Sequence, residues 1–430
     1  MFKYLSQLWS SEDLRKKILF TVGILVIYRV LAHITVPGAN IESLQAISNQ
    51  NDLLSVFSLL TGGSTENFSI VLMGISPYIN ASIIIQLLTV IVPKLETLSK
   101  EGEAGRRKLN TYTRWLTLPL AVLQSYGMII LMNTLYATVP IVDTSSLTVM
   151  IPVMLTITAG TLLLVWLGEQ ITEKGIGNGI SLIIFASIIS QVPQMIGQGL
   201  ILADSDQSRL VPLAAVALLT VALITAVILV NEAQRRVPIT YGSAAVKKDE
   251  SFLPIRINQA GMIPIIFAVA MVSFPSILGQ FLVNARSPWL QDLGNTMTTI
   301  LTVNSPGYTA LFYILIVAFT YFYVSITFNP EQVAENIQNR GGYIPGVRPG
   351  SQTVEYLQKI STRLTLFGSN FIALIAVIPI ILQFAFNTTG VGSVPLLISG
   401  AGILIVVGTV LELIRQANAQ LVMHDYKKFY

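Results

Sequence analysis

Ten long apolar runs divide the chain, and more polar segments separate them. The runs cover residues 18–36, 70–92, 115–137, 149–167, 180–202, 211–230, 262–283, 308–328, 365–386 and 394–413. Each run is roughly 20 residues long, which is enough for an α-helix to cross a bilayer core of about 30 Å. Because every backbone polar group must be satisfied inside lipid, runs of this composition are expected to be helices. The pattern predicts an all-α, polytopic membrane protein with ten transmembrane helices.

The composition excludes an ordinary soluble domain. The chain has 430 residues, of which 53% are hydrophobic and 11% are charged, and its mean hydropathy is +0.67. A water-soluble domain carries about 25% charged residues. The low content of charged residues is therefore what we expect of a chain with most of its length in lipid.

Positive charge is sorted along the chain. Of the 26 Lys and Arg residues, only Arg29, Arg209 and Arg286 lie away from the two chain ends and from every second gap between the apolar runs. Lys and Arg are retained on the cytoplasmic side of membrane proteins. We therefore expect a multi-pass protein of the cytoplasmic (inner) membrane with both termini in the cytoplasm. Nine or eleven spans would break the alternation.

The ten runs divide into two halves of five, residues 1–203 and 204–430. The second and seventh runs both begin with the pattern Gly-x-x-Pro, at Gly74 and Gly261. Five spans per half place the halves in opposite orientations, and inverted repeats with Gly/Pro-interrupted spans point to a pathway where the repeats meet. The alternative is a chance echo, since Gly and Pro are common in membrane helices.

A short apolar segment precedes the second span. Residues 52–60 read DLLSVFSLL, and glycines follow at positions 62 and 63. The segment is too short to span a bilayer and is typical of a re-entrant or interfacial element. An amphipathic piece that rests on the outer leaflet is the simpler interpretation.

The two longest basic gaps, residues 231–258 and 329–364, predict a docking surface for a large cytoplasmic partner. Alternating Pro and Gly make tight turns that present Arg348 at a constrained tip. The candidate docking residues are Arg235, Arg236, Lys247, Lys248 and Arg348, with Arg106, Arg107 and Lys108 in an earlier gap. Anionic lipid and the charge that sets topology are the alternative explanations for these residues.

The chemistry of enzymes and ion-coupled transporters is not found inside the runs. The second to ninth runs contain no Asp, Glu, Lys or Arg; Arg29 and His33 lie in the first run and Glu412 near the end of the tenth. Intramembrane carboxylates usually mark proton or ion pathways. Two histidines and no cysteine leave no metal site to expect. We predict no catalytic residues, no metal and no cofactor.

Isoleucines recur at helical spacing in two of the runs. Ile75, Ile79 and Ile83 lie four residues apart, and Ile180 and Ile184 repeat this spacing. If these faces point inward, they form a hydrophobic constriction that blocks water and ions by dewetting. The alternative is that they face lipid or a neighbouring helix, as most isoleucines in membrane helices do.

Several long motifs resemble the SecY family, which supplies the central subunit of the bacterial protein-conducting channel. They read GISPYINASIIIQLLT at 74–89, KEGEAGRRK at 100–108, WLGEQITEKGIGNGIS at 166–181, NPE at 329–331 and PGVRPG at 345–350. The motifs are spread from the first span to the gap at residues 329–364, so the resemblance covers essentially the whole chain.

The resemblance implies a ten-helix clamshell with an hourglass pore. Its pore ring would be Ile75, Ile79, Ile83, Ile180, Ile184, Ile266 and Ile405. Residues 57–72 match the plug that closes the outer funnel, with Phe57, Leu59, Leu60, Gly62, Gly63 and Phe68 as its members.

The lateral gate would lie between spans 2–3 and 7–8, with Asn80, Gln124 and Asn258 at its polar positions. The family usually has Ser or Thr where Asn80 stands, and an amide there would bridge a closed gate more strongly. The resemblance also assigns Arg348 to engagement of a motor ATPase or a ribosome.

The function implied is passage of unfolded secretory polypeptides, with their signal sequences, and lateral release of hydrophobic segments into the lipid bilayer. The implied partners are the small membrane subunits SecE and SecG, the motor SecA, the ribosome and nascent polypeptides. A secondary transporter for a small solute and a scaffold for another membrane complex are the other two hypotheses.

Overall fold

The structure is a computed structural model of the whole chain. It describes residues 11–39, 67–135, 140–144, 146–205, 210–241, 251–283, 287–301, 305–388 and 399–428.

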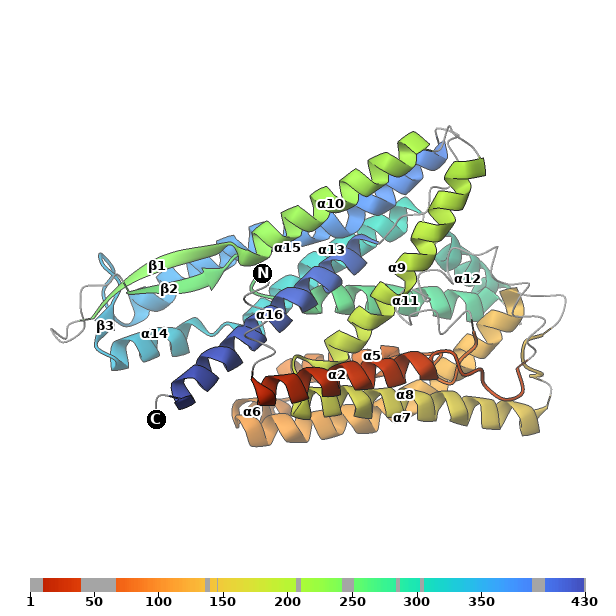
Figure 1. The fold of residues 1–430 in the computed structure, drawn as a ribbon, viewed down its shortest axis with the longest axis horizontal. Helices are drawn as coiled ribbons and strands as arrows, with labels where there is room; N and C mark the ends of the chain where they lie inside the picture. Colours follow the sequence, from red (N-terminus) through yellow and green to blue (C-terminus); the bar gives the residue numbers. More distant parts are fainter. Residues whose placement is uncertain are drawn as a thin grey trace. The chain divides into compact units, whose positions relative to one another are not determined.

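Every predicted apolar run overlaps one long helix (Figure 1). These helices are α2 (Glu12–Leu31), α5 (Ser76–Ile91), α7 (Glu103–Leu135), α8 (Leu147–Lys174), α9 (Gly179–Ser205), α10 (Leu210–Glu232), α11 (Ile263–Val283), α13 (Pro306–Thr327), α15 (Ser351–Thr388) and α16 (Gly400–Lys428). The shorter helices are α6 (Pro93–Lys100), α12 (Pro288–Ile300) and α14 (Pro330–Asn339), and the strands are β1 (Gln234–Tyr241), β2 (Ser251–Arg256) and β3 (Gly342–Tyr343).

Within the described residues, six helices are long and apolar enough to cross a membrane. A seventh is added if α5 and α6, which meet at an angle of 102°, count as one span. The break lies at Val92, which has extended backbone angles and precedes Pro93. A residue before proline is pushed out of the helical region, so the sequence itself ends α5 there.

The chain separates into two compact units. Unit 1 comprises Met1–Ser205, Val269–Tyr308 and Thr409–Tyr430, and unit 2 comprises Asp206–Ala268 and Thr309–Gly408. The division into inverted halves at residues 203 and 204 stays a prediction.

Unit 1 packs its helices through glycine contacts. α5 lies against α7, α7 against α8, and α8 against both α9 and α2. At Gly160 of α8 a side chain would collide with the backbone carbonyl of Ile70, and at Gly179 one would collide with the carbonyl of Gly168. Glycine is therefore needed where α8 approaches the segment before α5 and the start of α9.

Unit 2 contains a small antiparallel sheet with the order β2-β1-β3. β1 pairs with β2 from Gln234↔Arg256 to Ile239↔Ser251, and its end pairs with β3 at Thr240↔Tyr343. Its buried side chains pack on those of α14, α15 and the turn between them, forming one core: Val237, Ile255, Ala334, Ile344 and Leu357. The two long basic segments of the sequence are thus one folded module, which we call the basic module.

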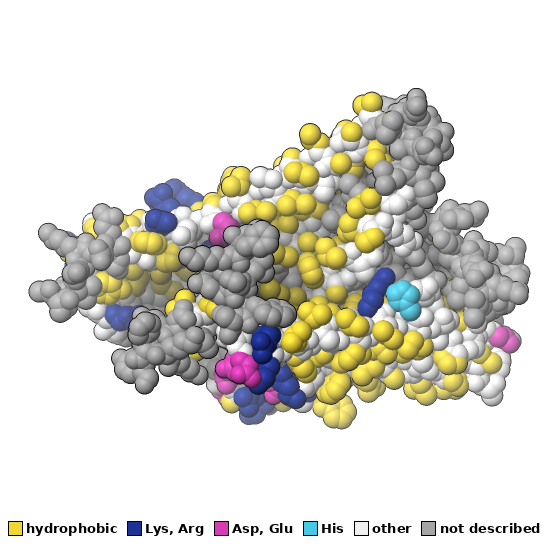
Figure 2. All heavy atoms as spheres, in the orientation of Figure 1, with side chains coloured by type: hydrophobic (Ala, Val, Ile, Leu, Met, Phe, Trp, Pro, Cys, Tyr) yellow, Lys and Arg dark blue, Asp and Glu magenta, His cyan; other side chains and the backbone are white. Residues whose placement is uncertain are grey.

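The outer faces of the spans are apolar, as lipid requires. On α2 the side chains of Val22, Val26 and Val30 are each at least half exposed. Figure 2 shows hydrophobic side chains spread over this helix, and a cluster of Lys, Arg, Asp and Glu side chains near the start of α2 and beside α6. There Glu12 and Lys16, and Glu96 and Lys100, form exposed ion pairs one helical turn apart.

Candidate channel site

The entry into α5 orients the predicted isoleucine face. Gly74 has a φ of +54°, and its N–H donates to the carbonyl of Val71 over 2.8 Å. Ile75 is the N-cap residue, and Pro77 stands in the first turn of the helix, where its missing N–H costs nothing. Because the helix begins here, Ile75, Ile79 and Ile83 follow one another along a single face.

A small open cleft in unit 1 brings three of the predicted isoleucines together. It is lined by Tyr28, Met73, Gly74, Ile75, Ser76, Ile79, Leu164, Ile183, Ile184 and Ser187. The two serines and the phenol of Tyr28 provide its polar side-chain groups, and no charged side chain lines it. Ile75 and Ile79 come from α5 and Ile184 from α9, so the cleft joins the two helices on which the sequence predicts an inward isoleucine face.

The other two isoleucines of unit 1 are packed differently. Ile83 is buried on the same face of α5 as Ile75 and Ile79 but does not line the cleft. Ile180 packs toward α8, where a Cβ atom added at Gly168 would lie 2.8 Å from the Ile180 Cδ1 atom. The structure therefore places Ile83 and Ile180 around the cleft rather than in its wall.

Sequence reasoning missed the hydrogen-bonded polar pair in the lining of the cleft. The hydroxyl groups of Tyr28 and Ser187 lie 2.6 Å apart, and the Ser187 hydroxyl also donates to the carbonyl of Ile183 over 2.9 Å. Tyr28 is 1% exposed. A buried tyrosine hydroxyl usually finds a partner. The sequence signal for this pair is a tyrosine within the first apolar run, and that signal does not identify Ser187 on α9 as its partner.

Replacing Tyr28 with phenylalanine is expected to lower the free energy of unfolding by about 1 kcal/mol, because it removes one buried hydrogen bond while the ring stays. The measurement is thermal unfolding of the purified protein in detergent. The control is Tyr112→Phe on α7, whose side chain is exposed. Equal melting temperatures for the two variants would contradict a stabilising role for the Tyr28–Ser187 bond.

The predicted ring residues of unit 2 lie near the starts of α11 and α16. Ile266 is half-buried in the first turn of α11, and Ile405 is 1% exposed in α16. These two helix segments are neighbours, since a Cβ atom added at Gly408 would lie 3.5 Å from Met262 Cβ. No described contact joins Ile266 to Ile405, so their membership of one ring stays a prediction.

Most of the predicted plug, namely Phe57, Leu59, Leu60, Gly62 and Gly63, lies outside the described residues. Phe68 is described and is fully buried, with a φ of +43°.

The chain around Phe68 is held in place. The carbonyl of Phe68 accepts the N–H of Val36 over 2.9 Å, and the N–H of Ile70 donates to Ile34 over 2.9 Å. The ring belongs to a core cluster that includes Met128 and Met132 of α7. The backbone and side chain of Phe68 are thus held in a fixed position next to the start of α5.

The predicted gate amides differ in their bonding. Asn80 on α5 and Gln124 on α7 are half-buried, and no hydrogen bond of their side chains is found among the described residues. Asn258 donates to Asn231 Oδ1 over 2.7 Å and both donates to and accepts from the backbone of Gly261. Asn258 therefore ties the end of α10 to the turn that leads into α11.

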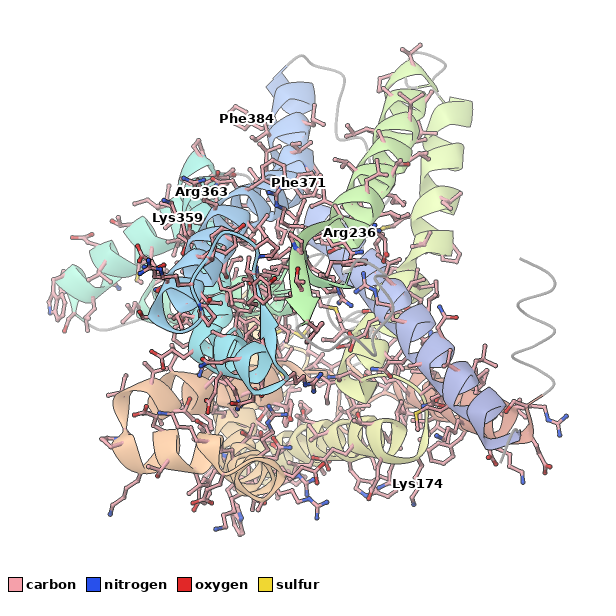
Figure 3. The ribbon with its side chains drawn as sticks, turned by 90° about the vertical axis from the view of Figure 1, so that its left-hand side faces the viewer. Lys174, Arg236, Lys359, Arg363, Phe371 and Phe384 are labelled. Atoms are coloured by element: carbon pink, nitrogen blue, oxygen red, sulfur yellow. The ribbon has the colours of Figure 1, made fainter. Side chains whose placement is uncertain are left out.

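The predicted docking residues are exposed where the structure describes them. Arg235 and Arg236 lie on β1, and Arg106, Arg107 and Lys108 lie at the start of α7. The guanidinium of Arg236 lies 4.7 Å from the ring centroid of Phe252 on β2. Figure 3 labels Arg236 on this hairpin, and Lys359 and Arg363, two further basic residues of the module, on α15. Lys247 and Lys248 lie outside the described residues.

Arg348 sits on a tight turn of the basic module. Gly346 has a φ of +80° and Gly350 a φ of +101°, and the carbonyl of Arg348 accepts the Thr353 hydroxyl over 3.0 Å. The backbone is thereby fixed while the side chain stays exposed. The prediction of a constrained tip is confirmed by this turn.

The comparisons with known proteins agree over the whole chain. The SecY family model matches residues 69–414. The protein translocase subunit SecY of Bacillus subtilis is 42% identical over 445 residues, which cover 100% of this chain and 99% of that protein. The SecY protein of Streptomyces griseus is 38% identical and covers 100% of both chains. The chain belongs to the SecY family.

Solved structures support the same fold. One described as the structure of a protein-conducting channel has a TM-score of 0.65 at 19% identity and covers 94% of this chain and 92% of the other. Sec61 in a canine ribosome–channel complex has a TM-score of 0.62 at 18% identity over the same shares.

Membership of the SecY family makes this a multi-pass membrane protein and a channel subunit of the protein translocase, not a catalytic enzyme. The prediction of an all-α fold with ten transmembrane helices is confirmed.

Proposed function

We propose that the isoleucine cleft of unit 1 is one side of the narrowest point through which an unfolded polypeptide passes. The observation that carries the proposal is the convergence of Ile75, Ile79 and Ile184 from two helices on one uncharged cleft. Ile83 and Ile180 lie next to this lining, and the proposed ring also includes Ile266 and Ile405 of unit 2.

An apolar constriction suits a channel that must pass many different chains. An apolar wall makes no specific bond to the passing polypeptide, so it does not discriminate between polypeptide sequences. When the constriction is empty, it excludes water and ions by dewetting. The described lining offers no charge that would hold an ion, and its two serines have no histidine, carboxylate or lysine beside them in the lining to activate a hydroxyl for attack on a peptide bond. Energy for transport must then come from a partner or a gradient.

Lateral release follows from partition into lipid. Leu, Ile, Phe and Val each favour the bilayer centre by about 0.3–0.6 kcal/mol, so a long apolar segment gains several kcal/mol by leaving the pore. We place the exit between spans 2–3 and 7–8, with Asn80, Gln124 and Asn258 along its edges. Residues 57–72 close the outer funnel at rest, and Phe68 anchors that segment.

The partners follow the distribution of charge. The exposed basic module, with Arg348 at its tip, faces the cytoplasm and receives SecA or a translating ribosome. SecE and SecG complete the assembly in the cytoplasmic membrane. The positive-charge pattern supports cytoplasmic termini, and five spans per half support inverted halves at 1–203 and 204–430.

The proposal is tested by trapping a polypeptide in transit. A photo-reactive phenylalanine analogue in place of Ile79 should cross-link to a secretory precursor that is arrested halfway through the membrane. The matched control carries the analogue in place of Leu163, which lies next to the cleft residue Leu164 on α8 but is 37% exposed on the outer face.

The readout is the yield of the precursor adduct after illumination of native membranes. A high yield from position 79 and little from position 163 is expected. An equal yield from the two positions, or none from position 79 while the precursor stays arrested, would place the pathway elsewhere.

A further inference from the structure

The short helix α12 has three chemically distinct faces. Its glycine face packs on the protein: Gly294 is buried, and a Cβ atom there would lie 2.5 Å from the Val283 backbone nitrogen at the end of α11. A Cβ atom added at Gly279 of α11 would lie 3.0 Å from Met297 Cβ and 3.3 Å from Thr298 Cγ2. Glycine on both helices thus lets α12 lie directly against α11, as the two ribbons do in Figure 1.

A second face of α12 is apolar and uncovered. Trp289 is 65% exposed, Leu293 41% and Ile300 51%. At 100° per residue these three side chains fall within about 40° of one another around the helix. They form a narrow apolar stripe that no described part of the protein covers.

The third face is polar and exposed, and it carries Gln291, Asp292, Asn295 and Thr299. In a helix buried in a protein core this polar face would be desolvated, and in a helix surrounded by water the apolar stripe would be exposed to solvent. One protein face, one apolar face and one polar face match a helix that lies at the edge of a membrane protein, in the plane of the bilayer surface.

We infer that α12 is an interfacial anchor whose Trp289–Leu293–Ile300 stripe is seated in the outer lipid leaflet. The chain connectivity supports lipid as the occupant, because α12 begins five residues after α11 ends and stops six residues before α13 begins. Such connections reach at most about 20 Å. Since α11 and α13 are spans, α12 is tethered at the membrane surface. Tryptophan is enriched at that depth because its ring is apolar and its N–H is polar.

Insertion of the α12 stripe into lipid would fix the position of the outer end of α11. The glycine contact joins α12 to the last turns of α11, so lipid that holds α12 also holds α11 at a set depth. The inference needs only that the protein spans a membrane, and it stands or falls independently of the proposed pore and gate.

The test is quenching of Trp289 fluorescence by brominated phospholipid. The full-length chain, purified with the subunits that accompany it, is placed in phosphatidylcholine vesicles after Trp9→Phe, Trp115→Phe and Trp166→Phe leave Trp289 as its one tryptophan. Bromine at acyl carbons 6 and 7 should quench more strongly than bromine at carbons 11 and 12, because an interfacial helix lies about 5–10 Å deep.

A matched pair of variants in the single-tryptophan protein checks the orientation. Leu293→Asp on the apolar stripe should reduce quenching by about half, because a carboxylate pulls the stripe toward water. Asn295→Asp adds the same charge on the polar face and should leave quenching unchanged. Absence of bromolipid quenching in the parent would overturn the inference, whether acrylamide reaches the tryptophan, which means water, or fails to, which means a covering protein.

Discussion

Serine in place of both Ile79 and Ile184 is expected to make the resting membrane leak ions. The two side chains come from different helices and line one cleft, so the double change adds hydroxyl groups to facing walls. Burial of one large aliphatic side chain is worth about 1.5–3 kcal/mol, and that preference is what keeps an apolar constriction dry.

The size of the leak follows from the barrier. A loss of about 1.4 kcal/mol from the barrier to ion passage raises the rate tenfold, so two such substitutions should raise conductance by at least roughly tenfold. The measurement is single-channel or macroscopic current across a planar bilayer that contains the assembled translocase without cargo.

Two controls separate a pore from general damage. Ile151→Ser on the exposed side of α8 makes the same chemical change where the side chain is 51% exposed. Restoring bulk with Ile79→Leu and Ile184→Leu should keep the membrane sealed. Unchanged current in the double serine variant, or an equal leak from Ile151→Ser, would remove these isoleucines from the pore.

The spans and the isoleucine face could be predicted from the sequence because both depend on local periodicity. A lipid environment demands about twenty apolar residues per helix, and a turn of four residues puts Ile75, Ile79 and Ile83 on one side. The convergence of α5 with α9 could not be read from spacing. It depends on close packing at glycines such as Gly160, which meets the backbone of Ile70 far back in the sequence, and Gly168, which meets Ile180 at the start of α9.

For the basic loops, the surface residues could be predicted from the sequence but the way the loops fold together could not. Their charge and turns predict a docking surface, and the tip at Arg348 is found as expected. The pairing of β1 with β3 joins residues about 100 positions apart, from Thr240 to Tyr343, and two-residue β3 carries no periodicity that a reader of the sequence could use. The sequence predicts a docking surface from the two gaps but gives no sign of a shared core, and the structure joins them in one core.

Asn258 illustrates a site residue with a second explanation. Similarity to a family assigns it to a gate, whereas its side chain makes three hydrogen bonds that organise the turn before α11. Sequence alone cannot weigh these roles, because the partner amide Asn231 lies on α10, on the far side of the β1–β2 hairpin in the sequence. Asn80 and Gln124, whose side chains have no hydrogen bond among the described residues, are the sharper positions at which to probe the gate.

Arg348→Glu is expected to reduce polypeptide export by at least roughly tenfold while the protein still inserts and folds. The side chain is exposed, and the glycines at 346 and 350 set the turn, so the fold does not need the guanidinium. Removing one partner of a desolvated charge pair costs about 2–5 kcal/mol, and in the proposed docking contact a reversed sign would turn attraction to an acidic group of the partner into repulsion. The measurement is the rate of precursor uptake into inverted membrane vesicles supplied with motor and ATP.

Lys359→Glu provides the matched control for this effect. Lys359 is exposed on α15 of the same basic module, and its substitution changes the net charge by the same two units. A docking role confined to the tip predicts a large loss for Arg348→Glu, a small loss for Lys359→Glu, and stronger motor binding to wild-type than to Arg348→Glu vesicles at low salt. Equal losses in both variants would show that only the overall positive field matters, since long-range attraction depends on net charge and is screened beyond about 10 Å at 0.1 M salt. Normal export by Arg348→Glu would exclude the tip from the contact altogether.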